Sequence, residues 1–250
     1  MSPSRRRVSG RVTGVVLVAA LAVAAAVVIT SPLFHIREVE VRGAGRLGEM
    51  EVIRLSGISL RDNLILADTG AAEDALLGSP WVAGASIERS LPGTLIISIR
   101  ERRPVAEVPD GRGAFSVVAA DGVVVARAER RNPALVELPP VPAGLAAGAR
   151  LGGQGAALRV AASFDERLRR LVSKLRVEGA EIRGTLAGGG EVRYGRAESM
   201  PQKNAAILNL VRYARREGLA VEYLDVSTPT SPVLKPAGAP EVAAPPDPGP

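Results

Sequence analysis

The longest apolar stretch of the chain lies near its start. The 18 residues from Val12 to Ile29 are Val, Ala, Leu, Ile, Gly or Thr, without a single charge. This length is close to the ~20 residues that a helix needs to cross about 30 Å of hydrocarbon. Because a helix satisfies its backbone polar groups internally, the pattern predicts a transmembrane helix over residues 12–30.

A basic cluster precedes this run and sets the expected topology. It consists of Arg5, Arg6, Arg7 and Arg11. The positive-inside rule makes residues 1–11 a cytoplasmic tail and predicts a single-pass type II protein in the cell membrane, with the bulk of the chain outside the cytoplasm. A cleaved signal peptide is the alternative, since small alanines lie near the end of the run. An apolar signal segment usually has about 7–15 residues, which favours an uncleaved anchor.

The next seventy or so residues, up to residue 101, alternate between short strand and helix patterns. Residues 35–42 alternate apolar and charged side chains, as a half-buried strand does, and residues 47–55 and 69–77 carry helical stripes. Residues 81–88 and 94–101 follow as two strands joined by a Leu-Pro-Gly turn. The predicted order is therefore strand, helix, helix, strand, strand. Within it we expect the single tryptophan, Trp81, to be buried, because its large apolar area favours the core.

The following segment reads as a second, β-rich domain with two helices. A hairpin is predicted over residues 115–126, turning at Asp121 and Gly122. Helical stripes cover 156–172 and 201–217. Short strands are expected at 174–178, 181–187, 191–194 and 220–227. Residues 228–250 hold eight prolines and few large apolar groups, so a disordered tail is expected there.

The composition of the chain argues against several classes of function. Outside the first 30 residues the chain carries 28 basic and 26 acidic residues, so the exported part is nearly neutral. The net charge of +6 therefore gives no reason to expect nucleic-acid binding, which needs clustered basic residues on one face. The chain has no cysteine, which excludes disulfides and thiolate metal sites.

Candidate chemistry is sparse. Residues 43–48 form a literal GxGxxG after a strand, yet the helix that follows is too short for a dinucleotide-binding crossover, so we expect a glycine-rich turn. The sole histidine, His35, is expected at a strand entry near the membrane, which is unfavourable for a catalytic triad. Ser199 lies four residues before Lys203, the one spacing that suits a Ser-Lys dyad, but a structural lysine is the simpler interpretation. We predict no enzyme activity, no catalytic residue, no cofactor, no metal and no small-molecule substrate.

Several segments resemble one protein family. They are FHIREVEVRG (34–43), SPWV (79–82) and RSLPGTLIISIRERRPVA (89–106), followed by DGVVV (121–125), VRYG (192–195) and LDVSTPTSPV (224–233). This series resembles the bacterial cell-division family FtsQ/DivIB. The resemblance implies an α+β fold with a single transmembrane helix, a POTRA domain (β-α-α-β-β) over 33–103 and a mixed β domain with two flanking helices over 104–227.

The resemblance also implies a function and partners. It implies a bitopic scaffold at the division septum that binds FtsB/DivIC-like and FtsL-like proteins and links early ring components to septal peptidoglycan synthesis. The alternatives are a POTRA-bearing secretion or assembly component and an exported hydrolase. A last strand without a successor should lie at a sheet edge and accept a partner strand. The predicted partner-binding residues are Tyr223, Leu224, Val226, Ser227, Thr228 and Val233. For Leu224 and Val226 the alternative is that they only complete the core.

Overall fold

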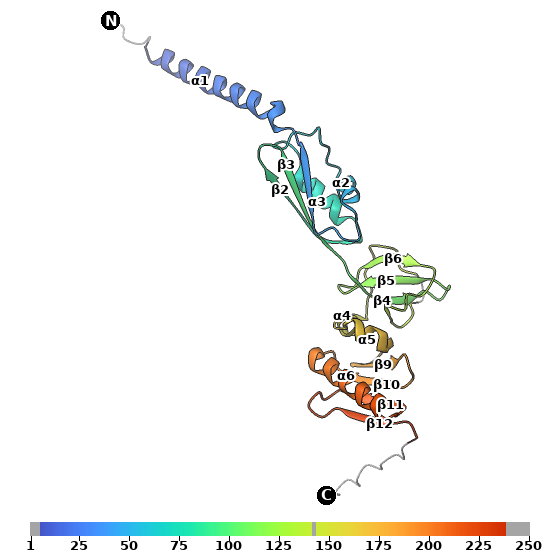
Figure 1. The fold of residues 1–250 in the computed structure, drawn as a ribbon. Helices are drawn as coiled ribbons and strands as arrows, with labels where there is room; N and C mark the ends of the chain where they lie inside the picture. The colour runs from blue at the N-terminus through green and yellow to red at the C-terminus, as the bar shows by residue number, and fades with distance from the viewer. Residues whose placement is uncertain (1–5, 142–143, 239–250) are drawn as a thin grey trace. The chain divides into compact units, whose positions relative to one another are not determined.

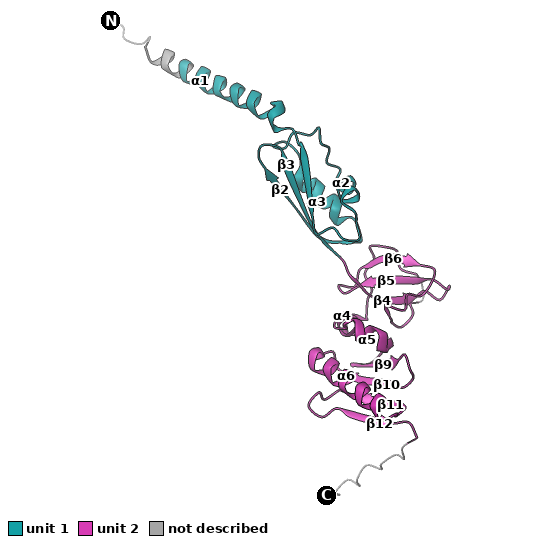
Figure 2. Cartoon of the chain, in the orientation of Figure 1, with its two compact units in different colours: residues 1–101 teal, residues 102–250 magenta. Residues whose placement is uncertain are grey.

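The computed structural model describes residues 6–141 and 144–238, with side chains described from Thr13 onward. The chain divides into two compact units, residues 1–101 and 102–250 (Figure 2). Each unit has its own hydrophobic core and is described by itself.

The first unit begins with helix α1, Arg6–Ile29, followed by the one-turn helix η1, Pro32–Phe34 (Figure 1). Side chains 13–28 of α1 are all exposed. Over the part of the chain whose side chains are described, no helix combines the length and the apolar character that crossing a membrane requires.

A three-stranded sheet with two helices makes up the rest of this unit. The elements are β1 (Glu38–Arg42), α2 (Glu49–Ser56), α3 (Thr69–Leu77), β2 (Val82–Ser90) and β3 (Thr94–Glu101). Their order along the chain is the predicted one. In the sheet, β3 lies in the middle, parallel to β1 and antiparallel to β2. Alternate residues of β3 are buried, as the alternation of Leu95, Ile97 and Ile99 predicts. The core joins these side chains to Ile36, Val52, Leu64, Ala72, Leu76 and Ile87.

Trp81 differs from the prediction, because it is only half-buried. It lies just before β2, and the guanidinium of Arg46 covers its ring at 4.0 Å from the centroid. A cation over an aromatic face stabilises a ring that is not enclosed by the core.

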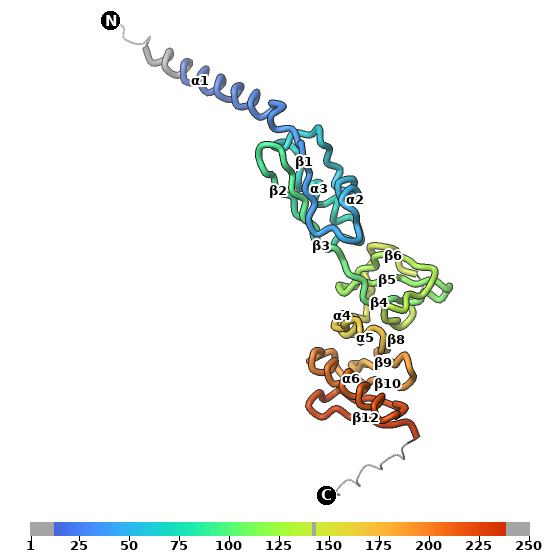
Figure 3. The backbone as a smooth tube through the Cα atoms, viewed as in Figure 1, coloured from blue at the N-terminus to red at the C-terminus, as the bar shows by residue number. Residues whose placement is uncertain are grey.

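The second unit is built on one long mixed sheet. Its described strands run in the order β12-β11-β10-β9-β8-β7-β4-β5-β6. They are β4 (Pro104–Pro109), β5 (Phe115–Ala119), β6 (Val124–Ala128), β7 (Val136–Glu137), β8 (Val172–Glu178), β9 (Glu181–Leu186), β10 (Glu191–Gly195), β11 (Val221–Asp225) and β12 (Val233–Pro236). The tube in Figure 3 follows the chain through these strands in sequence.

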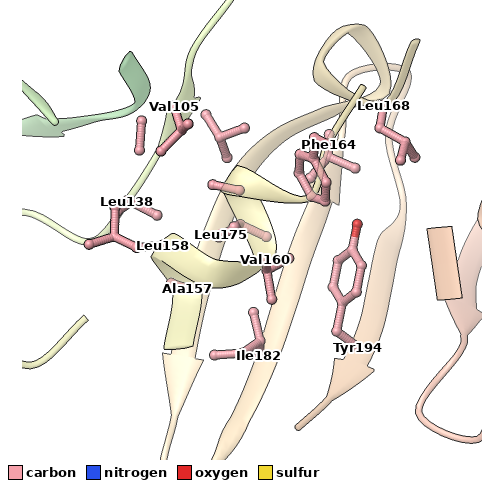
Figure 4. Close-up of a cluster of buried hydrophobic side chains, with 14 of the residues drawn as sticks. Val105, Leu138, Ala157, Leu158, Val160, Phe164, Leu168, Leu175, Ile182 and Tyr194 are labelled. Carbon is pink, nitrogen blue, oxygen red and sulfur yellow. The ribbon is translucent and has the colours of Figure 1, made fainter. Parts of the chain in front are cut away.

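Three helices accompany this sheet in the described part of the unit: α4 (Gly155–Ala162), α5 (Glu166–Leu171) and α6 (Met200–Arg216). Their apolar faces and the sheet share one core, seen in Figure 4, where Phe164 and Tyr194 lie near each other with ring centroids 6.0 Å apart. Large fully buried members are Leu138, Leu168, Leu175, Ile182, Tyr194, Ile207 and Leu224.

Two sequence predictions for this unit were wrong in detail. The single helix expected over 156–172 is two helices, because Ser163 ends α4 and the carboxylate of Asp165 caps α5 by accepting the backbone N–H of Leu168 at 2.9 Å. The tail expected from Thr228 onward is ordered at first, since residues 233–236 pair antiparallel with β11 as strand β12. Residues 239–250 of the expected tail lie outside the described residues.

Candidate partner-binding edge

The outermost strand at one end of the long sheet is β12, among the residues that the structure describes. The sequence predicted that the strand over 220–227 would form this edge. That prediction was wrong: β11 lies between β10, to which it is parallel, and β12, to which it is antiparallel. Four residues, Val233–Pro236, therefore take the place that β11 was expected to hold.

The six predicted partner-binding residues separate into two groups. Leu224 and Val226 are both 0% exposed and belong to the core, which was the alternative interpretation for these two. The backbone N–H of Val226 also donates to the carbonyl of Arg193 at 3.0 Å. By contrast, Ser227, Thr228 and Val233 are exposed, and Tyr223 is half-buried. Of the six predicted residues, the four that lie outside the core therefore have side chains that solvent can reach.

Two cations hold the ring of Tyr223. The guanidinium of Arg193 lies 3.9 Å from the ring centroid, and the Lys235 ammonium lies 5.7 Å from it. Lys235 is the cross-strand partner of Tyr223, and its Nζ also donates to Glu222 Oε1 at 2.9 Å. Sequence reasoning missed these cations. Lys235 lies directly across from Tyr223 on β12, and this becomes visible only once residues 233–236 are known to form a strand.

Hydrogen bonds fix the turn that joins β11 to β12. Oδ1 of Asp225 accepts the Ser227 backbone N–H at 2.9 Å and the Ser227 hydroxyl at 2.6 Å. The backbone N–H of Ser231 donates to the carbonyl of Thr228 at 3.1 Å. An aspartate that bonds two residues ahead is a local turn former, so this segment helps to hold β12 in register, together with Leu234, which packs against the core.

Helix α6 supports the strands beneath the edge through a buried lysine. Lys203 is 3% exposed, and its Nζ donates to the carbonyl of Tyr194 at 2.7 Å and to that of Arg196 at 2.9 Å. Burial lowers the pKa of Lys203, against the opposing charges of Glu198 and Asp225. Both carbonyls belong to the end of β10 and the turn after it. The lysine is thus a structural link between α6 and the sheet, the role expected for it in place of a catalytic dyad.

The glycine-rich segment 43–48 is a loop whose backbone N–H groups bind an anion, and that anion is a carboxylate of the same chain. Backbone N–H groups of Gly45, Arg46 and Leu47 donate to the Glu101 carboxylate at 3.0, 2.9 and 2.8 Å. Burial alone would raise the pKa of Glu101, but these bonds outweigh it and the pKa lies below its usual value. Gly43 has φ +80°, and a Cβ there would lie 2.1 Å from the carbonyl oxygen of Ile99. The glycines therefore serve close packing and a carboxylate of this chain.

Within the part of the chain that the structure describes, no group of three or more His, Asp or Glu side chains is placed to hold a metal ion. His35 stands at the entry to β1, where it forms an isolated bridge with Asn63.

Comparison with known proteins matches each unit to a family model. Residues 34–102 match the family model described as POTRA domain, FtsQ-type, and residues 106–227 match the model described as Cell division protein FtsQ/DivIB, C-terminal. Together these matches cover about three quarters of the chain.

Curated relatives agree with these models. Cell division protein FtsQ of Bradyrhizobium diazoefficiens is 35% identical over 92 residues, which are 37% of this chain and 27% of that protein. The FtsQ of Corynebacterium glutamicum is 35% identical over 40% of this chain and 43% of its own length. The FtsQ of Mycobacteroides abscessus is 29% identical over 88% of this chain and 68% of its own length. The chain thus aligns with less than half of the length of the first two relatives.

Proposed function

Because the chain belongs to the FtsQ/DivIB family of cell-division proteins, we propose that it is a non-catalytic scaffold of the division machinery, anchored in the cell membrane by residues 12–29. The apolar run, the four arginines before it and the exposed side chains of α1 support the anchor and its orientation. Localisation at the septum and a link from early ring components to septal peptidoglycan synthesis belong to the same proposal.

We further propose that β12 receives a strand of an FtsB/DivIC-like partner, with an FtsL-like protein in the same complex. The observation that carries this is the position of β12 as the outermost described strand, because alternate residues of such a strand turn their N–H and C=O groups away from the sheet. A partner strand that pairs there gains main-chain hydrogen bonds, while side chains beside the strand give specificity. Val233, at 50% exposed, and the Tyr223 ring between its two cations are the side chains best placed to do so.

Replacing Val233 by aspartate tests the docking site. The side chain is exposed, so the fold should be retained, while a charge on the edge opposes both strand pairing and apolar contact. We expect capture of FtsB/DivIC-like and FtsL-like proteins by the full chain to fall at least about tenfold.

Met50→Asp is the matched control, because Met50 is an apolar residue 79% exposed in the other unit. Undiminished capture by Val233→Asp would contradict docking at β12. Failure of cells that lack the protein to bring later division proteins to midcell would support the scaffold role independently of the docking site.

A further inference from the structure

Four exposed leucines lie in segments that meet at one end of the first unit. They are Leu33, Leu60, Leu66 and Leu91, with exposed fractions of 53, 57, 62 and 63%, and we call them the leucine face. Each comes from a different part of the chain: η1, the turn over residues 59–62, the loop before α3, and the hairpin between β2 and β3. A soluble surface rarely gathers large apolar side chains without a binding purpose.

Hydrogen bonds join these segments into one surface. The segment after η1 lies between two of the loops: the Leu64 N–H donates to the Phe34 carbonyl at 2.7 Å, and the Arg37 N–H donates to the Gly93 carbonyl at 2.8 Å. The guanidinium of Arg89 fastens the loop before α3, donating to the carbonyls of Leu64 and Ala67 at 2.8 Å each. The leucine face is therefore held by the fold and does not depend on loose loops.

The same end of the unit is tied to the end of α1. Nδ2 of Asn63 donates to the carbonyl of Ile29, the last residue of α1, at 2.7 Å. Figure 1 shows the β2–β3 hairpin and the loop between α2 and α3 at the end of the unit where α1 arrives. If α1 is the anchor of the proposed function, the leucine face begins at the point where the chain leaves the bilayer.

We propose that the leucine face rests on the membrane, with its leucines inserted among the lipid headgroups, so that the first unit is held against the bilayer and does not swing freely from α1. This inference rests on the proposed anchor. Charges beside the face have both signs, with Arg37 and Arg61 against Glu38 and Asp62, so apolar contact carries the interaction. Contact should accordingly depend little on the fraction of anionic lipid.

The absence of cysteine allows a clean spectroscopic test. Single-cysteine variants of the full chain are labelled with an environment-sensitive nitrobenzoxadiazole dye and reconstituted into phosphatidylcholine vesicles, with and without phosphatidylglycerol. The vesicles contain a lipid spin-labelled near the headgroup for the labels at Leu66 and Met50, and a lipid spin-labelled deep in its acyl chain for the label at Val23, which lies near the middle of the proposed span. Leu66→Cys reports on the leucine face and Val23→Cys on α1. Met50→Cys is the control, because α2 begins beyond the far end of β1, beside the Glu101 end of β3.

We expect strong quenching of the labels at Val23 and Leu66 in both lipid mixtures and little at Met50. Adding Leu60→Ser and Leu91→Ser to the Leu66→Cys protein should weaken binding of the leucine face to the bilayer. A leucine that is half-buried in lipid gains about half of its transfer free energy, so each leucine removed should lower the equilibrium constant for contact about fivefold. Adding Met50→Ser and Leu77→Ser, both far from the face, should leave the quenching unchanged. Trp81 emission checks that each variant is folded.

The outcomes separate this inference from the anchor. Quenching at Val23 without quenching at Leu66 would overturn the leucine face and leave the anchor standing. Absence of quenching at Val23 would overturn the anchor. Quenching at Leu66 that survives the two serine substitutions would show that the leucines do not cause the contact, and would overturn the inference as well.

Discussion

Replacing Glu101 by glutamine should weaken the first unit, because its carboxylate closes the loop between β1 and α2. Oε1 accepts from Gly45 and Leu47, and Oε2 accepts from Arg46. A glutamine has the same shape and keeps one carbonyl oxygen, so the two bonds to Oε1 survive as neutral ones. At the other position an amide NH₂ meets the Arg46 N–H at 2.9 Å, where two donors repel.

The magnitude follows from the bonds that change. A hydrogen bond to a charged group contributes about 1.5–3 kcal/mol, roughly twice a neutral one. The substitution removes one such bond and weakens two others. Because water can reach part of this exposed loop and replace some of the lost bonding, we expect the free energy of unfolding to fall by about 2 kcal/mol. For a unit of this size that loss lowers the urea midpoint by about 2 M.

Urea unfolding followed by tryptophan fluorescence measures this loss selectively. Trp81 is the only tryptophan of the chain and lies in the first unit, so its emission reports on that unit alone. The pKa of Glu101 is lowered by folding, so its contribution is present above the unfolded pKa and is lost as the pH falls through the folded pKa. The two proteins should therefore differ at pH 7.5 and converge as the pH falls below about 4.

Glu38→Gln, at an exposed glutamate of β1, is the control and should change stability little. If Glu101→Gln unfolds at the same urea concentration as the wild type at pH 7.5, the carboxylate does not hold the loop. A difference that persists unchanged to pH 3 would mean that charge is not the cause.

Three further predictions concern stability and are measured by urea unfolding at pH 7.5, followed by far-ultraviolet circular dichroism for the two variants of the second unit and by Trp81 emission for the variant of the first unit. Lys203→Met should cost about 2 kcal/mol, because it removes the Lys203 donor from the buried carbonyl of Tyr194 and from the partly buried carbonyl of Arg196; a loss below about 0.5 kcal/mol would contradict the structural role. Burial raises the pKa of Glu107, although its carboxylate accepts the Asn132 N–H at 2.9 Å and pairs with Arg131 at 3.2 Å. The free energy of unfolding of the wild type should therefore rise relative to that of Glu107→Gln as the pH falls from 7.5 through the folded pKa; a difference that does not change with pH would refute this. Gly43→Ala should cost about 3 kcal/mol, because its Cβ would lie 2.1 Å from a β3 carbonyl oxygen at φ +80°; wild-type stability would show that the loop can move.

The sequence predicted most elements because their signals are local. Alternation over 94–101 and the helical stripe over 201–217 depend on neighbours two to four residues away, and both elements formed. The split between α4 and α5 was missed for the same reason. The apolar stripe continues through residues 163–165, and only the capping bonds of Ser163 and Asp165 reveal the break.

Features that depend on distant pairing could not be predicted. Glu101 is 54 to 56 residues from the N–H groups that it binds, and nothing near it in sequence marks it as their acceptor. For the candidate edge, the sequence located the region but misplaced the outermost strand. β12 has only four residues, ends in a proline and lies in a proline-rich stretch, so its composition resembles a tail. Its pairing with β11 makes it a strand.

The composition of β12 also explains how this strand can remain the outermost described strand of its sheet. Pro232 precedes the strand and Pro236 ends it, and neither has an N–H to offer to another chain. Lys235 adds a charge within a strand only four residues long. Prolines, lysines and short length are the devices by which edge strands avoid indiscriminate pairing. So few main-chain bonds cannot hold a partner strand by themselves. If a partner docks at β12 as proposed, it must also bring side chains that fit Val233 and the Tyr223 ring, and this requirement would make the edge selective.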